Sequence, residues 1–449
     1  MMRAKPSVFY LVFISAVLLA GFPAIGAEKL SMKDAVARAL SQNPLVSEAA
    51  LNIASQLHKD IAVHRERFGS LSIDYNYNRS KDPPYMTVNT PAFGGDFETG
   101  KRDDVIWGIS AKVPIFTGFD ISTREAIERL GVDVKKVRKK EVELDVAAAA
   151  KRAYLTVLLA ERNLNTAEDA DKRLTAHLRV AKALYGQGMT PYNDVLKAEV
   201  ALSQTQQQLV ARQEELGTAR AGLNLVMHEK DIEKTYELRD PPEDNQATME
   251  PGLNGLFKKS LANRPELKAI SLAIDQARLK TTLARGKVLP KIYLVGRYEQ
   301  HGEDLLANKN IFDNQNNLYT GINMEWLLFD WNRHGQEEAA IEKDVMALKK
   351  ARDAALDNIR LEVRSAWGRL RAARRNIETA RLALAQAKED LRITRLQYGQ
   401  QVASATDVID SETTLTKVMN NYYKTLYTYK MALVDLDRAC GILDVDEQR

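Results

Sequence analysis

The chain repeats itself, and this repeat limits the folds that it can adopt. Tyr185-Gly186-Gln187 recurs as Tyr398-Gly399-Gln400, and Asp194-Val195-Leu196 recurs as Asp407-Val408-Ile409. Both pairs are 213 positions apart (398 minus 185; 407 minus 194) in a chain of 449 residues. Self-similarity at a fixed distance indicates copies of one supersecondary unit. We therefore expect two tandem halves with the same order of elements.

The limits of the halves follow from these motifs and from the composition between them. The first half covers 27–238 and the second covers 251–443, with a linker at 239–250 and a tail at 444–449. The linker is proline-rich and charged, as connections between structural units are. Residues 1–26 hold two basic residues, an apolar run at 8–19 and then small residues. This pattern predicts a secretory signal peptide, because the run is shorter than the roughly 20 residues of a membrane-spanning helix.

Apolar residues at seven-residue intervals predict coiled-coil helices. The ladders after the two repeated motifs are Val195, Leu202, Leu209, Leu216, Leu223 and Val408, Leu415, Tyr422, Tyr429, Leu436, Leu443. A strict period of seven over several heptads produces coiled-coil packing. The helices turn at glycine-containing tips, about 186–191 and about 399–405. The candidate helix caps are Thr190 at the first tip and either Ser404 or Thr406 at the second.

The helix lengths differ on the two sides of each tip. The helix before each tip begins near Thr123 or Arg333 and runs roughly 65 residues, about 100 Å at 1.5 Å per residue. The helices after the tips end near Met227 and Cys440 and are about half as long. Shorter helices at about 30–68 and 251–287 would stack end to end with them.

Four runs of alternating apolar and polar residues predict strands. They lie at about 70–80, 104–115, 290–299 and 317–328, and polar, glycine-containing connections join each pair. Each run has the length of a tilted membrane-crossing strand. Four strands cannot close a membrane barrel, since the smallest barrels have about eight strands. A dimer, trimer or tetramer would share a barrel of 8, 12 or 16 strands. The alternative is two soluble hairpins packed on helices.

Several functional classes are disfavoured. The net charge of +4 argues against a nucleic-acid binder, and one cysteine forbids an intrachain disulfide. The six histidines show no metal-ligand spacing, and no phosphate-binding loop, HExxH or GxSxG motif occurs. We therefore expect no enzyme activity, no catalytic residue, no metal and no cofactor. One class that stays open is a secreted or surface coiled-coil structural protein without a pore.

The repeated tips and the order of elements resemble the TolC family of bacterial outer-membrane channel proteins. The tip sequences are Tyr-Gly-Gln-Gly-Met-Thr-Pro-Tyr-Asn-Asp-Val-Leu and Tyr-Gly-Gln-Gln-Val-Ala-Ser-Ala-Thr-Asp-Val-Ile-Asp. The resemblance implies a mainly α protein with two tandem repeats of helix–β-hairpin–helix–helix. It implies a homotrimer with a shared 12-stranded barrel in outer-membrane lipid and a coiled-coil tunnel in the periplasm.

The resemblance also implies a function and partners. Proteins of this kind are exit ducts of tripartite efflux or type I secretion systems. A periplasmic adaptor joins them to an inner-membrane pump of the RND or ABC type. The duct would passively conduct small molecules or exported protein, and its sequence does not identify the cargo.

Candidate functional residues lie at the tips. Asp407 and Asp410 share one helix face and match the family's aspartate constriction, so threefold symmetry would make two acidic rings. Helix-dipole compensation is the simpler role for Asp407. Asp194 is its first-half equivalent, with a capping or a gating role.

Two tyrosines end the heptad ladders before the tips. Core packing is the default expectation for Tyr398 and Tyr185, and the family uses the tyrosine matching Tyr398 as a latch. Both tyrosines, together with Asp194, are therefore candidates for a gating or latch role at the tip. The family's gating arginine falls at Ala403 here, which disfavours a salt bridge of that type. Gly186, Gly188 and Gly399 are the expected adaptor contacts, besides shaping the turns.

Overall fold

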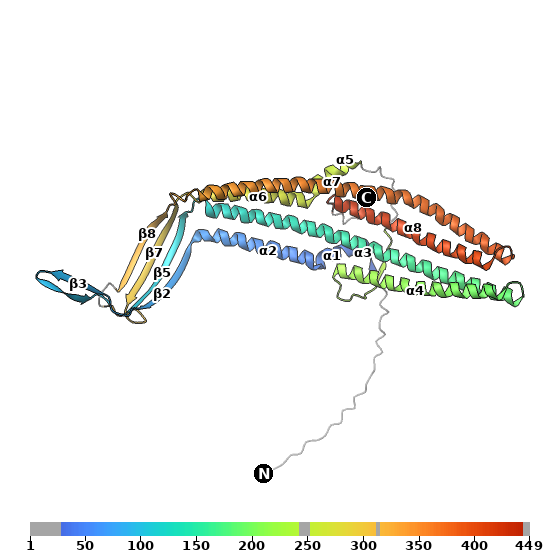
Figure 1. Cartoon of the computed structure of the whole chain (residues 1–449), viewed down its shortest axis with the longest axis horizontal. Helices are drawn as coiled ribbons and strands as arrows, with labels where there is room; N and C mark the ends of the chain where they lie inside the picture. The colour runs from blue at the N-terminus through green and yellow to red at the C-terminus, as the bar shows by residue number, and fades with distance from the viewer. Residues whose placement is uncertain (1–27, 242–251, 311–314, 443–449) are drawn as a thin grey trace, which may run out of the picture.

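The computed structural model describes residues 28–241, 252–310 and 315–442. It is an elongated molecule with a four-stranded sheet at one end and two helical hairpin tips at the other (Figure 1). The predicted signal peptide at 1–26, most of the predicted linker and the tail at 444–449 lie outside the described residues. Within the part of the chain that is described, no helix has the length and apolarity needed to span a bilayer.

Two long helices form the frame of the molecule. Helices α3 (Asp120–Gly186) and α7 (Arg333–Gly399) have 67 residues each. Near the tips they pack against α4 (Tyr192–Met227) and α8 (Ala405–Ala439). Nearer the sheet they pack against α2 (Pro44–Arg65) and α6 (Pro265–Gly286). Each long helix therefore runs beside two shorter helices placed end to end.

The helices predicted at about 30–68 and 251–287 are each broken in two. Helix α1 (Met32–Gln42) precedes α2, and α5 (Leu253–Asn263) precedes α6. The breaks fall at Asn43 and Arg264, which have ψ values of 129° and 117°. Each of them precedes a proline, whose ring disfavours the helical conformation of the residue before it.

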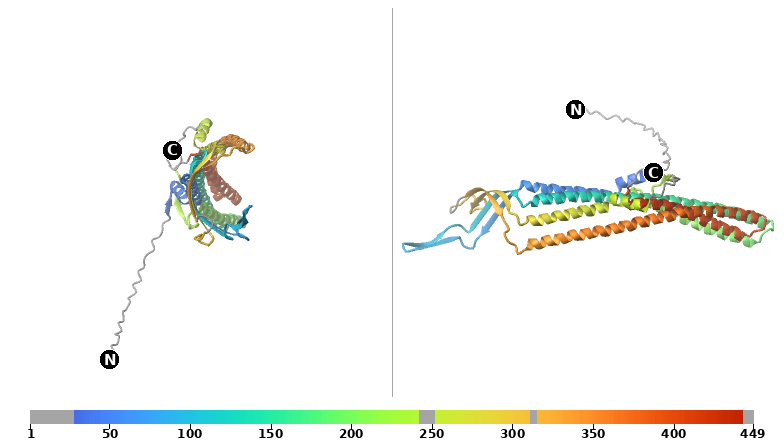
Figure 2. Two further views of the ribbon diagram at one scale, coloured as in Figure 1. Left: turned by 90° about the vertical axis from the view of Figure 1, so that its left-hand side faces the viewer. Right: turned by 90° about the horizontal axis from the view of Figure 1, so that it is seen from above.

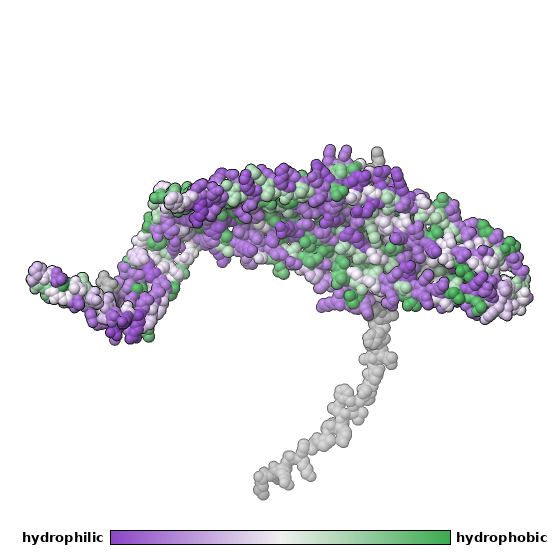
Figure 3. Space-filling model, viewed as in Figure 1, coloured by the Kyte–Doolittle hydropathy of each residue, from purple (hydrophilic) through white to green (hydrophobic). Residues whose placement is uncertain are grey.

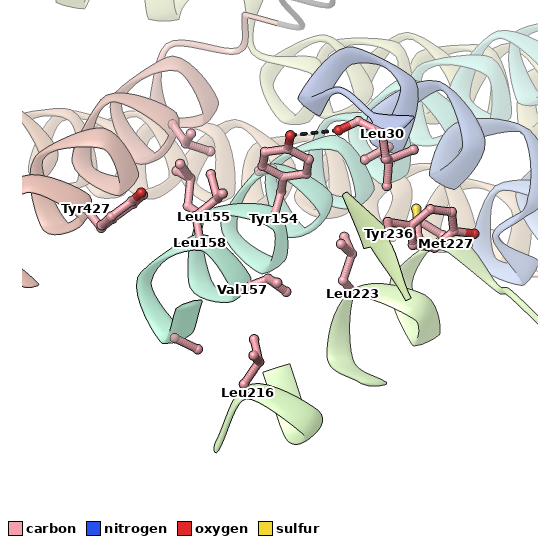
Figure 4. Packing of buried hydrophobic residues seen from close by; sticks show 14 residues of the cluster. Leu30, Tyr154, Leu155, Val157, Leu158, Leu216, Leu223, Met227, Tyr236 and Tyr427 are labelled. Carbon is pink, nitrogen blue, oxygen red and sulfur yellow. Dashed lines mark hydrogen bonds between the residues drawn. The ribbon is translucent and has the colours of Figure 1, made fainter. Parts of the chain in front are cut away.

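The helical core lies where these elements meet midway along the molecule. Tyr154 and Leu155 of α3 are buried there with Leu223 of α4 and Tyr427 of α8 (Figure 4). The Tyr154 hydroxyl donates a hydrogen bond of 2.9 Å to the Leu30 carbonyl. Leu30 belongs to a parallel strand pair, β1 (Glu28–Leu30) and β6 (Tyr236–Leu238), that was not predicted. Seen end-on, the molecule is an arc with this pair on its convex side (Figure 2).

The sheet is antiparallel, with the strand order β2-β5-β7-β8. Its strands are β2 (Ser70–Arg79), β5 (Asp103–Phe116), β7 (Lys291–Gly302) and β8 (Asn316–Glu325). Strand β8 ends three residues before the predicted 328, where the Trp326 indole nitrogen donates to the Val288 carbonyl and the chain turns toward α7. The predicted connection at 79–103 holds an additional hairpin, β3 (Tyr85–Thr90) and β4 (Phe93–Glu98).

The register gives the sheet one apolar face and one polar face. Paired positions on the apolar face include Ile73, Ile109, Tyr298 and Leu318 across the four strands. On the opposite face, Arg297 forms ion pairs with Asp74 at 2.7 Å and Glu299 at 2.7 Å. Leu71, Ile73, Leu318 and Ile322 are each more than 70% exposed. Such alternation is typical of strands with lipid on one side and a polar lumen on the other.

Candidate pore constriction at the helical tips

The two tips have the same backbone geometry. The Met189 amide donates to the Leu184 carbonyl at 2.9 Å, and the Val402 amide donates to the Gln397 carbonyl at 2.8 Å. Both bonds close the end of the long helix around a residue with positive φ, which is Gly188 (71°) in one tip and Gln401 (62°) in the other. Such left-handed residues satisfy the last carbonyls of a helix and reverse the chain.

Asp407 caps its own helix. Its carboxylate accepts hydrogen bonds of 2.8 Å from the Ser404 amide and from the Ser404 hydroxyl, while its amide donates to that hydroxyl at 3.2 Å. These bonds from Ser404 hold the pKa of the Asp407 carboxyl below its ordinary value. Asp407 and Asp410 are both exposed. Asp407 thus lies in the first turn of α8, where its charge can also compensate the helix dipole as expected, and the carboxylate stays ionised and open to solvent.

Heptad spacing shows which way the two aspartates face. Asn421 and Lys424 stand 14 residues beyond Asp407 and Asp410, respectively (421 minus 407; 424 minus 410), and so occupy the same stripe of α8. They line a hollow together with Leu159 and Asn163 of α3. On α3 these two residues point away from Tyr154, which contacts the convex-side strand β1. The aspartates therefore face the concave side of the arc.

Tyr398 is buried between the two hairpins. It packs with Leu184 of the other hairpin and with Val408, and its ring lies 5.0 Å from that of His177. Neither the Tyr398 hydroxyl nor the His177 Nε2 atom has a hydrogen-bond partner. Burial, with the nearby Asp194 carboxylate, raises the pKa of Tyr398.

The first-half counterparts behave differently. Core packing was the default expectation for Tyr185, and within a single chain this is wrong, since Tyr185 is 47% exposed and its ring lies 5.2 Å from that of the exposed Tyr192. Asp194 does not cap its helix as Asp407 does, because Pro191 stands where the second half has Ser404. It lies instead close enough to His177 and Tyr398 to influence the pKa of each.

A buried ion cluster near the tips was missed by the sequence analysis. Glu412 of α8 is only 2% exposed and accepts from Arg395 of α7 and, at 2.7 Å, from Arg173 of α3. The first half has the matching pair Lys182 and Glu199 at 2.9 Å. Both residues of the second pair lie 213 positions after those of the first (395 minus 182; 412 minus 199). The repeat offset is the signal that could have found them.

The tip glycines are open to contact from outside. Gly186 and Gly399 are the last residues of their helices, and a Cβ atom added to either, or to Gly188, would meet nothing within 4 Å. Among the described residues, no group of three or more His, Cys, Asp or Glu side chains has an arrangement suited to a metal ion.

A long helical arc joined to a four-stranded sheet, one face of which is apolar and exposed, has the form expected of the wall of a membrane channel. The profile of the family described as "Outer membrane efflux protein" matches residues 35–227 and 256–442, and the chain belongs to this family. The family consists of channel proteins, and the protein is an outer-membrane exit duct that extends into the periplasm.

Named relatives and solved structures agree with this assignment. Outer membrane efflux protein BepC of Brucella suis is 23% identical over 96% of this chain and 90% of its own length. Alkaline protease secretion protein AprF of Pseudomonas aeruginosa is 22% identical over 82% of this chain and 76% of its own. The structure of CusC has a TM-score of 0.75 with 17% identity, covering 92% of each chain. The Campylobacter jejuni CmeC channel has a TM-score of 0.74 with 14% identity, covering 98% of this chain and 93% of its own.

The Glu412 cluster generates a prediction about stability. Glu412→Gln should destabilise the tip by about 1–3 kcal/mol, because it leaves the partly buried Arg173 guanidinium and the more exposed Arg395 guanidinium facing each other without a counter-charge. The apolar triple variant Arg173→Met, Glu412→Leu, Arg395→Met should retain most of the stability, since it removes all three charges. Limited proteolysis and thermal unfolding followed by circular dichroism measure both variants.

The exposed pair Glu389 and Arg392 on α7 provides the control. Glu389→Gln should change stability by less than about 1 kcal/mol, as is usual for exposed pairs. Equal effects of Glu412→Gln and Glu389→Gln would show that the buried cluster does not hold the hairpins in register.

His177 generates a prediction about pH. Burial and then Arg395 lower its pKa below 6.5, while Asp194 opposes the shift and Tyr398 faces it without charge. If the hairpins separate, the exposed histidine takes up its proton near pH 6.5, whereas the buried one does so only at lower pH. Falling pH therefore favours separation. We expect the rate at which a protease cleaves the tip to rise as the pH falls below about 6.5. His177→Gln should abolish this rise and His58→Gln, at an exposed site, should not; an unaltered rise in His177→Gln would contradict the account.

Proposed function

We propose that three copies of the chain close into a ring with a shared 12-stranded barrel and a helical tunnel. The observation that carries this proposal is the open sheet. In the part of the chain that the structure describes, β2 pairs only with β5 and β8 pairs only with β7. Unpaired strand edges are not tolerated in hydrocarbon, so β8 of one copy must pair with β2 of the next. Strand counting permits two, three or four copies, and the resemblance to TolC favours three.

The helical edges of the arc support the same closure. Near the tips the helices stand in the order α4, α3, α8, α7, so α4 and α7 are the outer members. Both carry large apolar side chains that are more than half exposed in a single copy. These are Val200, Val210 and Leu225 on α4, and Met346, Leu361 and Leu382 on α7. Such stripes at both edges are suited to contact between copies.

The unequal halves point the same way. Glu412 and Tyr398 are buried because α3 of the same chain lies beside their hairpin. Glu199 (side chain 42% exposed) and Tyr185 occupy the equivalent places on the hairpin at the edge of the arc. In a ring, α7 of the adjoining copy would stand where α3 stands for the second hairpin. The ring of three copies would then contain six similar helical hairpins around one axis.

We infer that Asp407 and Asp410 form two acidic rings at the narrow end of this tunnel. Both carboxylates face the concave side, and the pKa of Asp407 is held low. Stacked acidic rings concentrate cations and repel anions. Tyr398 and Asp194 would act as contacts that hold the tip closed, together with the Glu412 cluster.

The proposal extends to partners and cargo. A periplasmic adaptor would bind at Gly186, Gly188 and Gly399, where the backbone is unobstructed, and would connect the duct to an inner-membrane pump of the RND or ABC type. The relatives named for efflux and for protease secretion correspond to the two cargo classes, small molecules and exported protein. The protein would conduct either passively.

Conductance tests the constriction. Detergent-extracted protein in planar bilayers should form cation-selective channels, and Asp407→Asn with Asp410→Asn should reduce that selectivity several-fold because the fixed charge is lost. Ser404→Ala is the control, since it weakens the same helix cap without altering the ring charge. Selectivity that changes equally in Ser404→Ala would assign Asp407 to capping alone, and the absence of any channel would contradict the duct.

The glycines generate a separate prediction. Gly186→Ala and Gly399→Ala should leave folding intact, because both residues end helices and a Cβ meets open space. They should nevertheless weaken binding of the cognate adaptor, measured by co-purification, if the adaptor packs against this backbone. Gly188→Ala should instead strain the turn, since its φ is 71°. Full adaptor binding by both helical variants would contradict a role of these glycines in the contact.

A further inference from the structure

The β3–β4 hairpin projects beyond the end of the sheet that lies farthest from the helices (Figure 1). Among the described elements it packs substantially only against itself. Its six cross-strand pairs are joined by a two-residue turn at Pro91 and Ala92, and the Thr90 hydroxyl closes the turn on the Phe93 carbonyl at 2.6 Å. A single two-stranded hairpin is marginally stable in water, so this one needs a partner.

The register divides the hairpin into two chemically different faces. Met86 pairs with Phe97, Val88 with Gly95, and Thr90 with Phe93, and these pairs form one face. The Phe93 and Phe97 rings stack with centroids 5.2 Å apart, and both rings are exposed. The other face carries Tyr85 with Glu98, Thr87 with Asp96, and Asn89 with Gly94. The side chains of Met86, Val88, Phe93 and Phe97 thus make an uncovered apolar face.

Bilayer hydrocarbon is a poor cover for this face, because a charged collar separates the hairpin from the sheet. Arg79 pairs with Asp103 at the end of the sheet, and the Ser80 amide donates to the Arg102 carbonyl just beyond it. The collar consists of Arg79, Lys81, Asp82, Lys101, Arg102, Asp103 and Asp104. Figure 3 shows hydrophilic residues gathered over this junction. Charged side chains do not lie in hydrocarbon, so the collar marks the interface and the hairpin stands outside it.

We propose that the apolar face packs against the same face of the hairpins of neighbouring copies, forming a protein cap over the outer mouth of the barrel. This inference rests on the ring of three copies proposed above. Twelve strands about 4.8 Å apart and tilted about 40° enclose a cylinder about 24 Å across. The hairpin extends roughly 25 Å from the collar at 3.3 Å per residue. It is therefore longer than the barrel radius and long enough to reach the axis by folding over the mouth, where other copies of the chain would supply the matching apolar surface.

Cysteine cross-linking tests the cap in the full chain. The only native cysteine, the buried Cys440, is replaced by alanine. Val88→Cys places a thiol on the apolar face, and Asn89→Cys places one on the polar face of the same strand. A short bismaleimide should join two chains efficiently through position 88 and not through position 89. Native mass spectrometry of each sample counts the chains in the assembly.

The outcomes separate this inference from the proposed function. Three-chain assemblies with no product, or with equal products, at the two positions would overturn the cap and leave the duct intact. Assemblies of another size would overturn the proposed trimer. A thiol at position 88 that is shielded only in membranes containing lipopolysaccharide, without cross-linking, would assign the face to lipid and overturn the cap.

Conductance provides a second readout that does not require a cysteine. Phe93→Ser with Phe97→Ser should increase single-channel conductance, because the cap loses its apolar contacts. Tyr85→Ser removes an exposed aromatic ring from the opposite face and should leave the conductance unchanged. Unchanged conductance in the double phenylalanine variant would contradict a cap that narrows the mouth.

Discussion

The unpaired edges of the sheet are the constraint on which the rest of the structure depends. Strands β2 and β8 each leave one row of backbone groups without a strand partner among residues 28–241, 252–310 and 315–442. In hydrocarbon every such group costs several kcal/mol, so a single copy is not a stable membrane structure. The helices continue the same arc without a break, and their outer members expose apolar stripes on both sides. Closure of the sheet therefore decides the arrangement of the helices and of the tips.

The same constraint explains why two similar halves have different chemistry. Lys182 with Glu199 and Arg395 with Glu412 occupy matching places, but only the second pair has α3 of the same chain beside it. The second carboxylate is consequently buried and takes a third partner, Arg173. The first remains half exposed, at the edge where another copy would lie. This difference in burial between Glu199 and Glu412 is expected in a ring of identical chains, because the first hairpin of each chain meets its neighbour only when another copy is present.

Periodicity allowed much of the fold to be predicted, because it reports directly on which side of an element is buried. The long helices begin within three residues of the predicted Thr123 and Arg333. Ser404, one of the two candidates, caps α8, whereas the cap expected at Thr190 is wrong, because Pro191 is the residue that precedes α4. The strand pattern was visible because one face is apolar and the other is polar. The β3–β4 hairpin was missed because each strand has only six residues and β4 contains two adjacent glycines, so the alternation is short and interrupted.

The tip chemistry was less predictable than the fold. A buried carboxylate such as Glu412 cannot be distinguished by composition from the many exposed charges of a polar helix, and only the repeat offset marks it. Tyr185 was misjudged because the repeat treats equivalent positions as equal, while their neighbours in the chain differ. Asp407 lies three residues before Asp410 on the same helix. The sequence left its helix-dipole and lumenal roles open, and the bonds from Ser404 are compatible with both.

Hydrogen–deuterium exchange of the membrane-embedded protein tests the central claim most directly. If copies of the chain pair β8 with β2, the backbone amides of these two edge strands should be protected as strongly as those of the inner strands β5 and β7. Rapid exchange along β2 and β8 beside slow exchange in β5 and β7 would show that the edges remain open in the membrane, and would contradict the shared barrel.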